Sequence, residues 1–330
     1  MIWRRMEVFK TIDSVAFHKN TMITVGAFDG IHLGHHAIID NLIREAKRHF
    51  GRSILLTFSP HPQHFFAGNE NRLPLLTTFD EKIEQLQKKD LDAVLVLPFN
   101  EKIAQMSPEI FLQTIQDRIG LKALILGHNH SIGRNREGNI GKIREISREQ
   151  DFSLIEVDPV FFEKQEISST SVRNFLSAGK VDQAARFLGR QYTAKGHVIR
   201  GQSIGREIGY PTANLEFSDT DKLMPADGIY AGFICHNGQG YGAMIYIGSA
   251  PTLENGSHRV EAHLFDFSQS IYDDQIEIAF VEKIRDDRQF DRLDQLKKQI
   301  QKDEIIIKQI LEQYHWRLIW DCPRKQKQQL

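Results

Sequence analysis

The chain has few cysteines: Cys235 and Cys322 are the only two in 330 residues, and they lie far apart in no metal-binding spacing. This scarcity excludes a disulfide framework and a cysteine-based zinc site, and it fits a reducing compartment. Long apolar runs are also lacking, since no stretch approaches the roughly 20 residues that span a bilayer. We therefore expect a cytoplasmic protein without a membrane anchor.

An excess of charge of either sign is missing too. The formal net charge is -1 and the isoelectric point is near 6.9, which gives no overall field to attract nucleic acid or an anionic membrane. We expect small-molecule substrates as partners, with no nucleic acid and no membrane. At 38.0 kDa the chain is long enough for two domains that each bury a core, and its composition does not bear on oligomeric state.

One segment joins a predicted strand to a predicted helix through three glycines. Gly26, Gly30 and Gly34 permit tight turns and let a ligand approach the backbone closely. A helix that begins near Gly34 directs unpaired N–H groups and a partial positive charge at this loop. His32 and His35 flank the same point and can donate to phosphate oxygens, at about 3–4 kcal/mol of transition-state stabilisation per donor. A surface turn with two incidental histidines is the alternative for so short a motif.

Apolar periodicity divides the chain into two predicted domains, residues 1–188 and residues 189–330. In the first, short apolar runs alternate with amphipathic helices, which predicts a parallel sheet covered on both faces and ligand sites at the carboxyl ends of its strands. In the second, strands and turns predominate, with Asn237-Gly238 at a hairpin, before one long helix over 290–314. The strands of the first domain are predicted at 22–26, 54–58, 93–97, 123–126 and 154–157.

Two other segments have the composition of phosphate sites. At 167–173, Ser169 and Thr170 start a helix and Arg173 adds a cation where the helix dipole disfavours one, so a phosphate clamp explains more than a simple N-cap. At 201–214 a glycine-rich loop leads to Thr212 and Asn214, whose neutral oxygens suit Mg²⁺ when ATP supplies the charge. A plain glycine-rich hairpin is the alternative for that loop.

The string Gly-x-Phe-Asp-Gly-x-His-x-Gly-His from Gly26 resembles the adenylyltransferase half of the bifunctional bacterial riboflavin kinase/FAD synthetase family, within the nucleotidyltransferase superfamily. Ser-Ser-Thr-x-x-Arg at 168–173 and Thr-Phe-x-Pro-His-Pro at 57–62 are similar to further motifs of that family. The resemblance implies a Rossmann-like nucleotidyltransferase domain in which His32 and His35 are catalytic. It implies nucleotide contacts from Gly26, Phe28, Asp29, Gly30, Gly34, Asn129, Ser169, Thr170 and Arg173.

The loop at 127–133 departs from the family pattern Gly-x-Asp-x-x-Phe-Gly. Asn129 replaces the usual acid and Ile132 the usual aromatic residue, so a carboxylate contact is lost and a ring contact is weakened. Asn129 can still donate and accept hydrogen bonds, which keeps nucleotide recognition there. We interpret His61 and His130 as loop residues without chemistry.

The second domain resembles the riboflavin kinase module of the same family, through Gly-Arg-x-x-Gly-Tyr-Pro-Thr-Ala-Asn at 205–214 and several later motifs. The resemblance implies a barrel in which Glu261 is the catalytic base and Arg285 lies near the flavin. Departures occur at Tyr246, Ala250 and Asp273, beside the site. By the same resemblance the ATP-binding residues are Gly201, Gly205, Arg206, Thr212 and Asn214, with Thr212 and Asn214 holding the metal.

The implied enzyme transfers the γ-phosphate of ATP to riboflavin, giving FMN, and then joins AMP to FMN, giving FAD and pyrophosphate with Mg²⁺ as cofactor. Two alternatives stay open: a riboflavin kinase with a weakened adenylyltransferase half, motivated by Asn129 and Ile132, and a non-catalytic flavin or nucleotide sensor. A tRNA synthetase remnant is disfavoured because no Lys-Met-Ser-Lys-Ser string is present.

Overall fold

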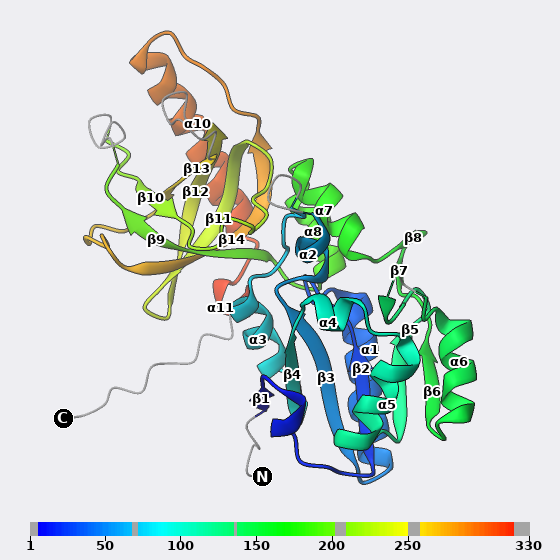
Figure 1. Ribbon diagram of the computed structural model, residues 1–330. Helices are drawn as coiled ribbons and strands as arrows, with labels where there is room; N and C mark the ends of the chain where they lie inside the picture. Colours follow the sequence, from blue (N-terminus) through cyan, green and yellow to red (C-terminus); the bar gives the residue numbers. More distant parts are fainter. Residues whose placement is uncertain (1–5, 68–71, 135–136, 202–208, 250–257, 320–330) are drawn as a thin grey trace, which may run out of the picture. The chain divides into compact units, whose positions relative to one another are not determined.

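The computed structural model describes residues 6–67, 72–134, 137–201, 209–249 and 258–319 (Figure 1). The chain divides into two compact units, Met1–Ser169 and Thr170–Leu330, here called the N-terminal and C-terminal units. The domain boundary predicted near residue 188 stays a prediction.

The N-terminal unit is built on a six-stranded, wholly parallel sheet in the order β1-β4-β3-β2-β5-β6, with helices on both faces (Figure 1). This confirms the predicted Rossmann-like α/β fold. The five predicted strands form within one or two residues of their predicted bounds, and a short edge strand, β1, is added. The bounds are β1 Glu7–Phe9, β2 Thr21–Val25, β3 Arg52–Ser59, β4 Ala93–Pro98, β5 Ala123–Gly127 and β6 Ser153–Val157.

Local sequence signals set the helix boundaries. Ser107 caps α5 by accepting from the N–H of Ile110, and Pro108 occupies the first helical position, as predicted. Thr78 and Glu81 form a reciprocal capping box on α3. The remaining elements of this unit are η1 Ile12–Ser14, α1 Leu33–Arg48, α2 Pro62–Ala67, α3 Phe79–Gln87, α4 Glu101–Ala104, α5 Pro108–Arg118, α6 Ile140–Glu149, β7 Phe161–Phe162 and β8 Gln165–Glu166.

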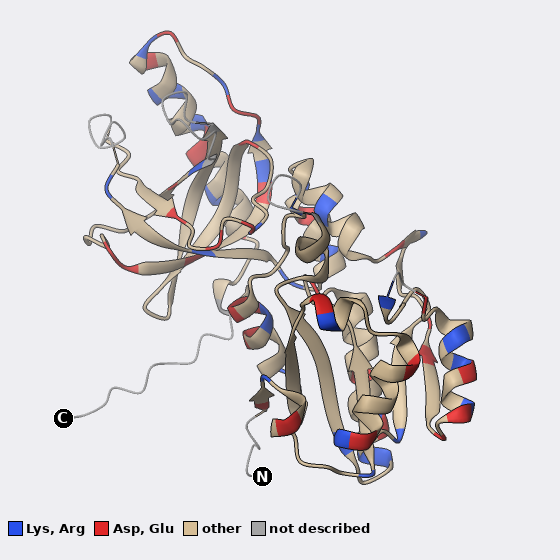
Figure 2. Cartoon of the chain, viewed as in Figure 1, with Lys and Arg blue, Asp and Glu red and all other residues tan. Residues whose placement is uncertain are grey.

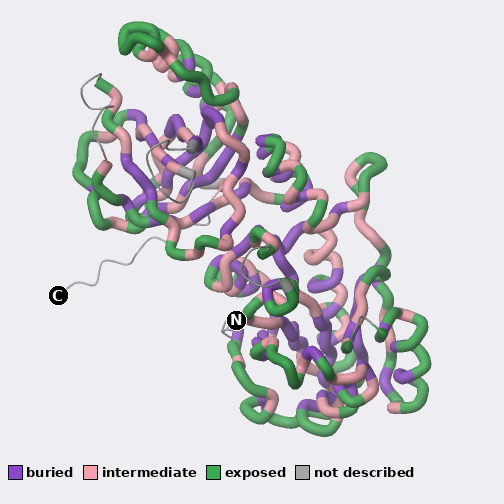
Figure 3. Tube along the Cα trace, turned by 45° about the horizontal axis from the view of Figure 1, so that its top comes forward, coloured by how far each residue is buried: buried purple, intermediate pink, exposed green. Residues whose placement is uncertain are grey.

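Strand order places the ligand crevice of this sheet. The chain runs from β2 through β3 to β4 on one side, then returns to add β5 and β6 on the other side of β2. The carboxyl ends of β2 and β5 therefore form the switch point at which open α/β sheets bind ligands. The central strands β2 to β5 are largely buried while the outer helix faces are exposed (Figure 3). The buried face of α1 packs against the sheet, with Ile39 and Leu42 fully enclosed. Burial of each such side chain stabilises the fold by about 1.5–3 kcal/mol.

The C-terminal unit contains a closed antiparallel barrel in the order β10-β13-β12-β11-β14-β9, which confirms the predicted all-β architecture. Asn237 and Gly238 both have positive φ and turn the hairpin between β11 and β12, as predicted. The strands are β9 Tyr192–Ile199, β10 Ala213–Glu216, β11 Gly228–His236, β12 Gln239–Ser249, β13 His258–Leu264 and β14 Gln275–Arg285.

Helices cover part of this barrel. The long terminal helix α10, Leu293–Leu311, packs Ile307 and Leu311 into an apolar cluster with β11, β12 and β14, as its apolar stripe predicts. It begins three residues later and ends three residues earlier than predicted. The short helix α11, Trp316–Ile319, follows it. Two helices precede the barrel, α7 Ser169–Ser177 and α8 Val181–Leu188, and α8 packs on β14 and β9.

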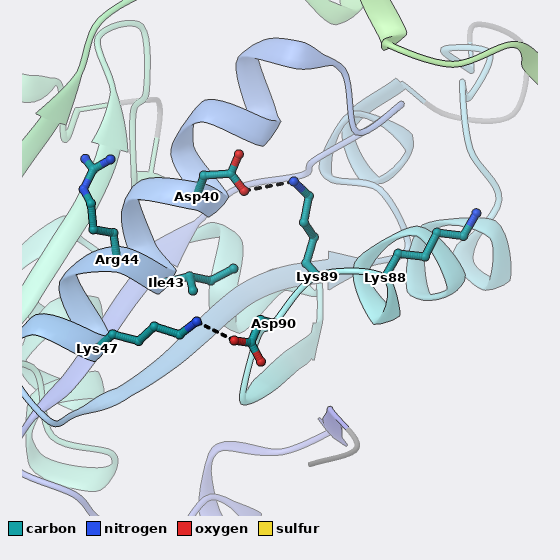
Figure 4. Close-up of a pocket in the computed structure, with 7 residues that line it drawn as sticks. All are labelled: Asp40, Ile43, Arg44, Lys47, Lys88, Lys89 and Asp90. Carbon is teal, nitrogen blue, oxygen red and sulfur yellow. Dashed lines mark hydrogen bonds and ion pairs between the residues drawn. The ribbon is translucent and has the colours of Figure 1, made fainter. Parts of the chain in front are cut away.

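Charges of both signs are interspersed over the surface, for example along α6 (Figure 2). A shallow groove of about 390 Å³ lies between α1 and the residues after α3 (Figure 4). Asp40 of α1 pairs with Lys89 at 2.9 Å, and Lys47 pairs with Asp90. Because most of these side chains are well exposed, each pair contributes only about 0–1 kcal/mol. The groove contains none of the predicted site residues. No helix in the described part of the chain is long and apolar enough to cross a membrane.

Candidate active sites

Three residues of the short loop between β2 and α1 have the left-handed backbone conformation. The φ angles are 48° at Phe28, 87° at Gly30 and 41° at Ile31. For the two residues with side chains this conformation costs roughly 1–2 kcal/mol each. It persists because Phe28 and Ile31 are almost fully buried in the core beside α1. The loop is therefore held in a fixed shape in front of the helix.

Asp29 anchors this loop from within. Its buried carboxylate accepts hydrogen bonds from the backbone N–H groups of Leu76 and Thr77, each at 3.1 Å, and the N–H of Gly30 donates to the Thr77 hydroxyl. A Cβ at Gly30 would lie 2.7 Å from Leu76, so glycine is required for space as well as for φ. The predicted contact of Asp29 with nucleotide stays a prediction, since these carboxylate bonds are within the protein.

His32 and His35 meet at the N-terminus of α1. Their rings stack with centroids 3.7 Å apart and planes inclined by 18°. His32 is the N-cap residue: its Nδ1 accepts from the backbone N–H of His35 at 3.3 Å. Because Nδ1 is the acceptor, the proton of the neutral His32 ring is on Nε2. Gly34 lies between them, and a Cβ there would be 3.1 Å from the His32 ring.

The His35 ring has an environment that favours its neutral form. Burial, reinforced by repulsion from His32 and His130, holds the pKa of His35 well below its ordinary value. The Phe28 ring packs 5.1 Å from it. Its buried Nδ1 has no hydrogen-bond partner among the described residues. A neutral imidazole with an unused polar atom at a helix N-terminus is suited to hydrogen bonding with a ligand.

His130 also lies at this junction, although its sequence context predicted a loop residue without chemistry. The ring centroid of His130 is 6.4 Å from that of Phe28, and its Nδ1 accepts from the N–H of Gly127 at 3.2 Å. A Cβ at Gly26 would lie 3.0 Å from its Nε2. The predicted residue Gly26 is therefore packed against a third imidazole.

Lys82 is a further residue that the sequence analysis missed. Its buried Nζ donates to the carbonyl of Ala27 at 2.7 Å, in the loop before α1. Burial lowers its pKa, against an opposing effect of the Asp29 carboxylate. The sequence does contain a sign that Lys82 is buried: it lies between Phe79 and Leu86 at helical spacing, and so falls on the apolar face of α3.

The structure gives contacts for part of the second predicted phosphate-binding segment, residues 167–173. Ser169, the last residue of the N-terminal unit, donates through its hydroxyl to the carbonyl of Asp29 at 2.9 Å, in the loop before α1. The carbonyl of Ile167 lies 3.3 Å from the Cβ position of Gly34. Thr170 and Arg173 belong to the C-terminal unit, and their contacts with nucleotide stay predictions.

The departures at 127–133 have separate structural explanations. Asn129 donates its amide to Glu166 of β8 at 3.1 Å, and His128 lies 3.4 Å from the same carboxylate. An acid at position 129 would face Glu166 with like charge, so the amide is compatible with this neighbour. Ile132 is buried in the core on the far side from α1, where an apolar side chain is well accommodated.

Four phenylalanines gather at the carboxyl ends of β3 and β4. Phe99 contacts Phe58, Phe65 and Phe66 edge to face, with ring centroids 5.4–5.8 Å apart. Phe66 is 68% exposed, which is unusual for a side chain of this size. This aromatic cluster (Phe58, Phe65, Phe66 and Phe99) lies at the same edge of the sheet as the loop of His32 and His35.

In the barrel, the predicted metal pair and the predicted base lie side by side. Thr212 donates its hydroxyl to Oε2 of Glu261 at 2.9 Å. The other carboxylate oxygen, Oε1, pairs with Arg259 at 3.1 Å. Asn214 is directly opposite Glu261 in the pairing of β10 with β13. The structure thus brings Thr212, Asn214 and Glu261 to one point on the barrel.

The glycine-rich loop is described only at its ends. A Cβ at Gly201 would lie 2.1 Å from the amide of Asn214, so this glycine permits the close approach of the loop to the predicted metal residue. Gly205 and Arg206 lie outside the described residues, as does Ala250. Their predicted roles stay predictions.

Arg285 has a strong protein partner. Its Nε and Nη2 both donate to Asp303 Oδ2, at 2.9 and 2.8 Å, and Asp303 is 1% exposed on α10. Gln299 completes the set by donating to the other oxygen of Asp303 at 2.8 Å. Arg285 therefore fastens β14 to α10, and its predicted flavin contact stays a prediction.

Two departures beside the kinase site are explained locally. Tyr246 is opposite Glu261 in the pairing of β12 with β13 and donates to Asp287 at 3.0 Å. Burial, with the Asp287 charge, raises the pKa of Tyr246 and keeps its hydroxyl protonated. Asp273 has a φ of 66°, in the left-handed region that glycine adopts without strain.

The two arrangements define a class of protein. Imidazoles at a helix N-terminus on a Rossmann-like sheet suit the binding of phosphate, and a hydroxyl, an amide and a carboxylate at one point on a barrel suit a metal-bound phosphate and a base, so both sites fit an enzyme that transfers phosphate-containing groups. The FAD synthetase family matches residues 14–171, and the riboflavin kinase family matches residues 188–311.

Curated relatives cover both units. A bifunctional riboflavin kinase/FMN adenylyltransferase of Buchnera aphidicola subsp. Schizaphis graminum is 35% identical, over 88% of this chain and 94% of the relative. Proteins of the same name from Haemophilus influenzae and Escherichia coli K12 are 33% and 29% identical, over 85% and 88% of this chain and 91% and 93% of theirs. The chain belongs to the bifunctional riboflavin kinase/FMN adenylyltransferase family.

A solved structure shares the fold over nearly the whole chain. It is a Streptococcus pneumoniae protein described as a macrolide-efflux protein, with a TM-score of 0.83 and 28% identity over 92% of this chain and 98% of its own. The match supports the architecture of both units. The residues of the two sites described above do not indicate macrolide efflux.

Proposed function

We propose that the barrel phosphorylates riboflavin to FMN at Glu261 and that the Rossmann-like unit adenylylates FMN to FAD at His32 and His35. Both activities are those of the family to which the chain belongs. The assignment of the kinase step is carried by the 2.9 Å bond between Thr212 and Glu261, which puts a carboxylate beside the predicted metal residues.

In the kinase step, Glu261 accepts the proton of the terminal ribityl hydroxyl of riboflavin. The hydroxyl oxygen forms a bond to the γ-phosphorus of ATP as the bond from that phosphorus to the β-bridging oxygen breaks, and ADP leaves with the electron pair. The hydrogen bond from Thr212 and the pairing with Arg259 hold the carboxylate in place for this transfer. General base catalysis of this kind contributes about a hundredfold to ten-thousandfold in rate.

The donor set fits Mg²⁺. Thr212 and Asn214 offer neutral, hard oxygen atoms, and the described residues contain no group of three or more His, Cys, Asp or Glu that could hold a metal ion unaided. Mg²⁺ in such a site is held largely by the phosphates of ATP and by water. When bound, it neutralises charge that develops on those phosphates.

In the adenylyl step, an FMN phosphate oxygen forms a bond to the α-phosphorus of ATP, and pyrophosphate leaves with the electron pair of the broken bond. Negative charge increases on the leaving group and on the α-phosphate. The first N–H groups of α1 and the imidazole N–H donors at its start meet that charge. The fixed loop holds these donors in position before substrate arrives.

The aromatic cluster suits the isoalloxazine ring of FMN. A planar aromatic ring gains about 0.5–1.5 kcal/mol from each favourable aromatic contact beyond burial of its area. Exposed Phe66 and half-buried Phe99 present such surfaces at the carboxyl edge of the sheet. We expect Phe66→Ala to raise the KM for FMN in FAD formation and to leave FMN formation from riboflavin unchanged.

We also place the enzyme in the cytoplasm, since the chain has only two cysteines and its phosphate donor, ATP, is an intracellular nucleotide. The test of the proposal is to incubate the purified chain with riboflavin, ATP and Mg²⁺ and to identify flavins by chromatography and mass. We expect FMN first and FAD after it. FMN without FAD would indicate a weakened adenylyltransferase half, and binding of riboflavin without any product would indicate a sensor.

A further inference from the structure

His130 occupies a place that its sequence context does not suggest. It follows β5, and β5 pairs with β2 next to it in the sheet. The carboxyl ends of these two strands therefore bring the segment from Gly127 to His130 beside Gly26, at the switch point of the sheet. Phe28 contacts the rings of both His35 and His130, with centroid distances of 5.1 and 6.4 Å.

A backbone hydrogen bond fixes the orientation and the tautomer of the His130 ring. The N–H of Gly127 donates to Nδ1 at 3.2 Å, and the N–H of His130 returns a bond to the Gly127 carbonyl at 3.0 Å. Nδ1 is therefore an acceptor. Burial lowers the pKa of His130, against an opposing effect of its hydrogen bond with the Gly127 backbone, and so favours the neutral ring. Its single ring proton is then on Nε2.

The glycines around the ring leave the space that the imidazole occupies. A Cβ at Gly26 would lie 3.0 Å from Nε2, and a Cβ at Gly127 would lie 3.0 Å from Nδ1. Both strand ends thus carry glycine where the imidazole is seated. None of the described residues accepts a hydrogen bond from Nε2, so an N–H donor is directed toward the backbone of the loop that precedes α1.

We propose that His130 is a third imidazole donor of the adenylyl-transfer site, whose Nε2–H hydrogen-bonds an oxygen of the ATP polyphosphate held at the mouth of α1. The proposal rests on the proposed adenylyl function of this unit. It assigns to His130 a substrate-positioning contact, distinct from the N-cap role of His32 and from the buried ring of His35.

Two substitutions separate a donor from a packing group. His130→Gln keeps an N–H donor at about the reach of Nε2 and loses the ring, whereas His130→Phe keeps the ring and loses both nitrogens. FAD formation is measured from FMN and ATP, so that the kinase step is not needed, and the KM for ATP is obtained separately from kcat. FMN formation from riboflavin by the same preparations, together with thermal unfolding, reports on folding.

We expect His130→Phe to lower kcat/KM for ATP in the adenylyl reaction by about 10- to 100-fold, the effect of losing one hydrogen bond to a charged group. We expect His130→Gln to retain most of the wild-type value, with kinase activity unchanged in both variants. Activity retained by His130→Phe and lost by His130→Gln would overturn the proposal in favour of a packing role. A wild-type chain that makes no FAD from FMN would instead contradict the proposed function itself.

Discussion

The hydroxyl of Thr212, the residue before β10, donates to the carboxylate of Glu261 on β13 at 2.9 Å. The two residues are 49 positions apart in sequence, and the pairing of β10 with β13 brings them together. A residue predicted to hold the metal and the residue predicted to remove a proton are thus parts of one hydrogen-bonded group. We therefore expect kinase activity to be sensitive to replacement of one oxygen of the Glu261 carboxylate by an NH2 group.

Glu261→Gln tests that sensitivity. The amide cannot accept a proton from the ribityl hydroxyl, so we expect FMN formation to fall by about a hundredfold to ten-thousandfold. FAD formation from added FMN should be unchanged, because that reaction belongs to the other unit. Glu216→Gln, an exposed glutamate on β10, serves as the matched control. Kinase activity within threefold of wild type in Glu261→Gln would exclude Glu261 as the base.

The ion pair of Arg285 with Asp303 gives a prediction for stability. Asp303→Asn leaves a guanidinium, 20% exposed, without its charged partner. We expect this variant to lower the free energy of unfolding by about 3 kcal/mol, measured by urea denaturation. Asp294→Asn, on the same helix but in an exposed pair with Arg292, should cost less than 1 kcal/mol. Equal effects of the two substitutions would contradict a structural role for the Arg285–Asp303 pair.

The packing of Gly30 in the loop before α1 can be tested by comparison with Gly209, which lies before β10. Both have φ near +87°, but a Cβ at Gly30 would meet Leu76, whereas a Cβ at Gly209 would meet none of the described residues within 4 Å. Substitution by alanine adds the backbone strain of roughly 1–2 kcal/mol at both positions, and adds the steric clash only at Gly30. We therefore expect Gly30→Ala to lower the unfolding free energy by more, and to reduce FAD formation. A larger loss of unfolding free energy in Gly209→Ala than in Gly30→Ala would show that the loop before α1 accommodates a Cβ at Gly30, and would contradict this account.

The pKa of His35 makes stability depend on pH. Burial, with the charges of His32 and His130, holds this pKa well below 6.5 in the folded chain. The unfolded chain then binds a proton that the folded chain does not, so the stabilisation is complete above about pH 6.5 and is lost as the pH falls below it. We expect the melting temperature to fall between about pH 7 and about pH 5, and to fall less steeply in His35→Gln. His18→Gln, a substitution of an exposed histidine, is the control for the loss of one imidazole.

The sequence predicted the features that depend on neighbouring residues. The buried strands, the Ser107 cap and the Asn237-Gly238 hairpin all follow from local pattern and were confirmed. The clustering of Thr212 with Glu261 was predicted through the family resemblance, because nothing local joins residues so far apart.

What the sequence did not predict depends on tertiary proximity. His130 and Lys82 reach the loop before α1 only because β5 lies next to β2 and because α3 packs beside that loop. Asp303 is on α10, whose apolar stripe predicts packing on the barrel but not a buried carboxylate that pairs with Arg285 of β14. In each case a polar side chain on an otherwise ordinary element acquires its partner from an element distant in sequence.

The central claim is that two separate sites carry out two successive phosphate chemistries, and a mixing experiment tests it most directly. Glu261→Gln and His35→Asn are each incubated with riboflavin, ATP and Mg²⁺, alone and together. We predict that His35→Asn alone accumulates FMN, that Glu261→Gln alone makes neither flavin product, and that the mixture produces FAD. FAD formation from riboflavin by either variant alone at the wild-type rate would contradict the assignment of the reactions to these residues.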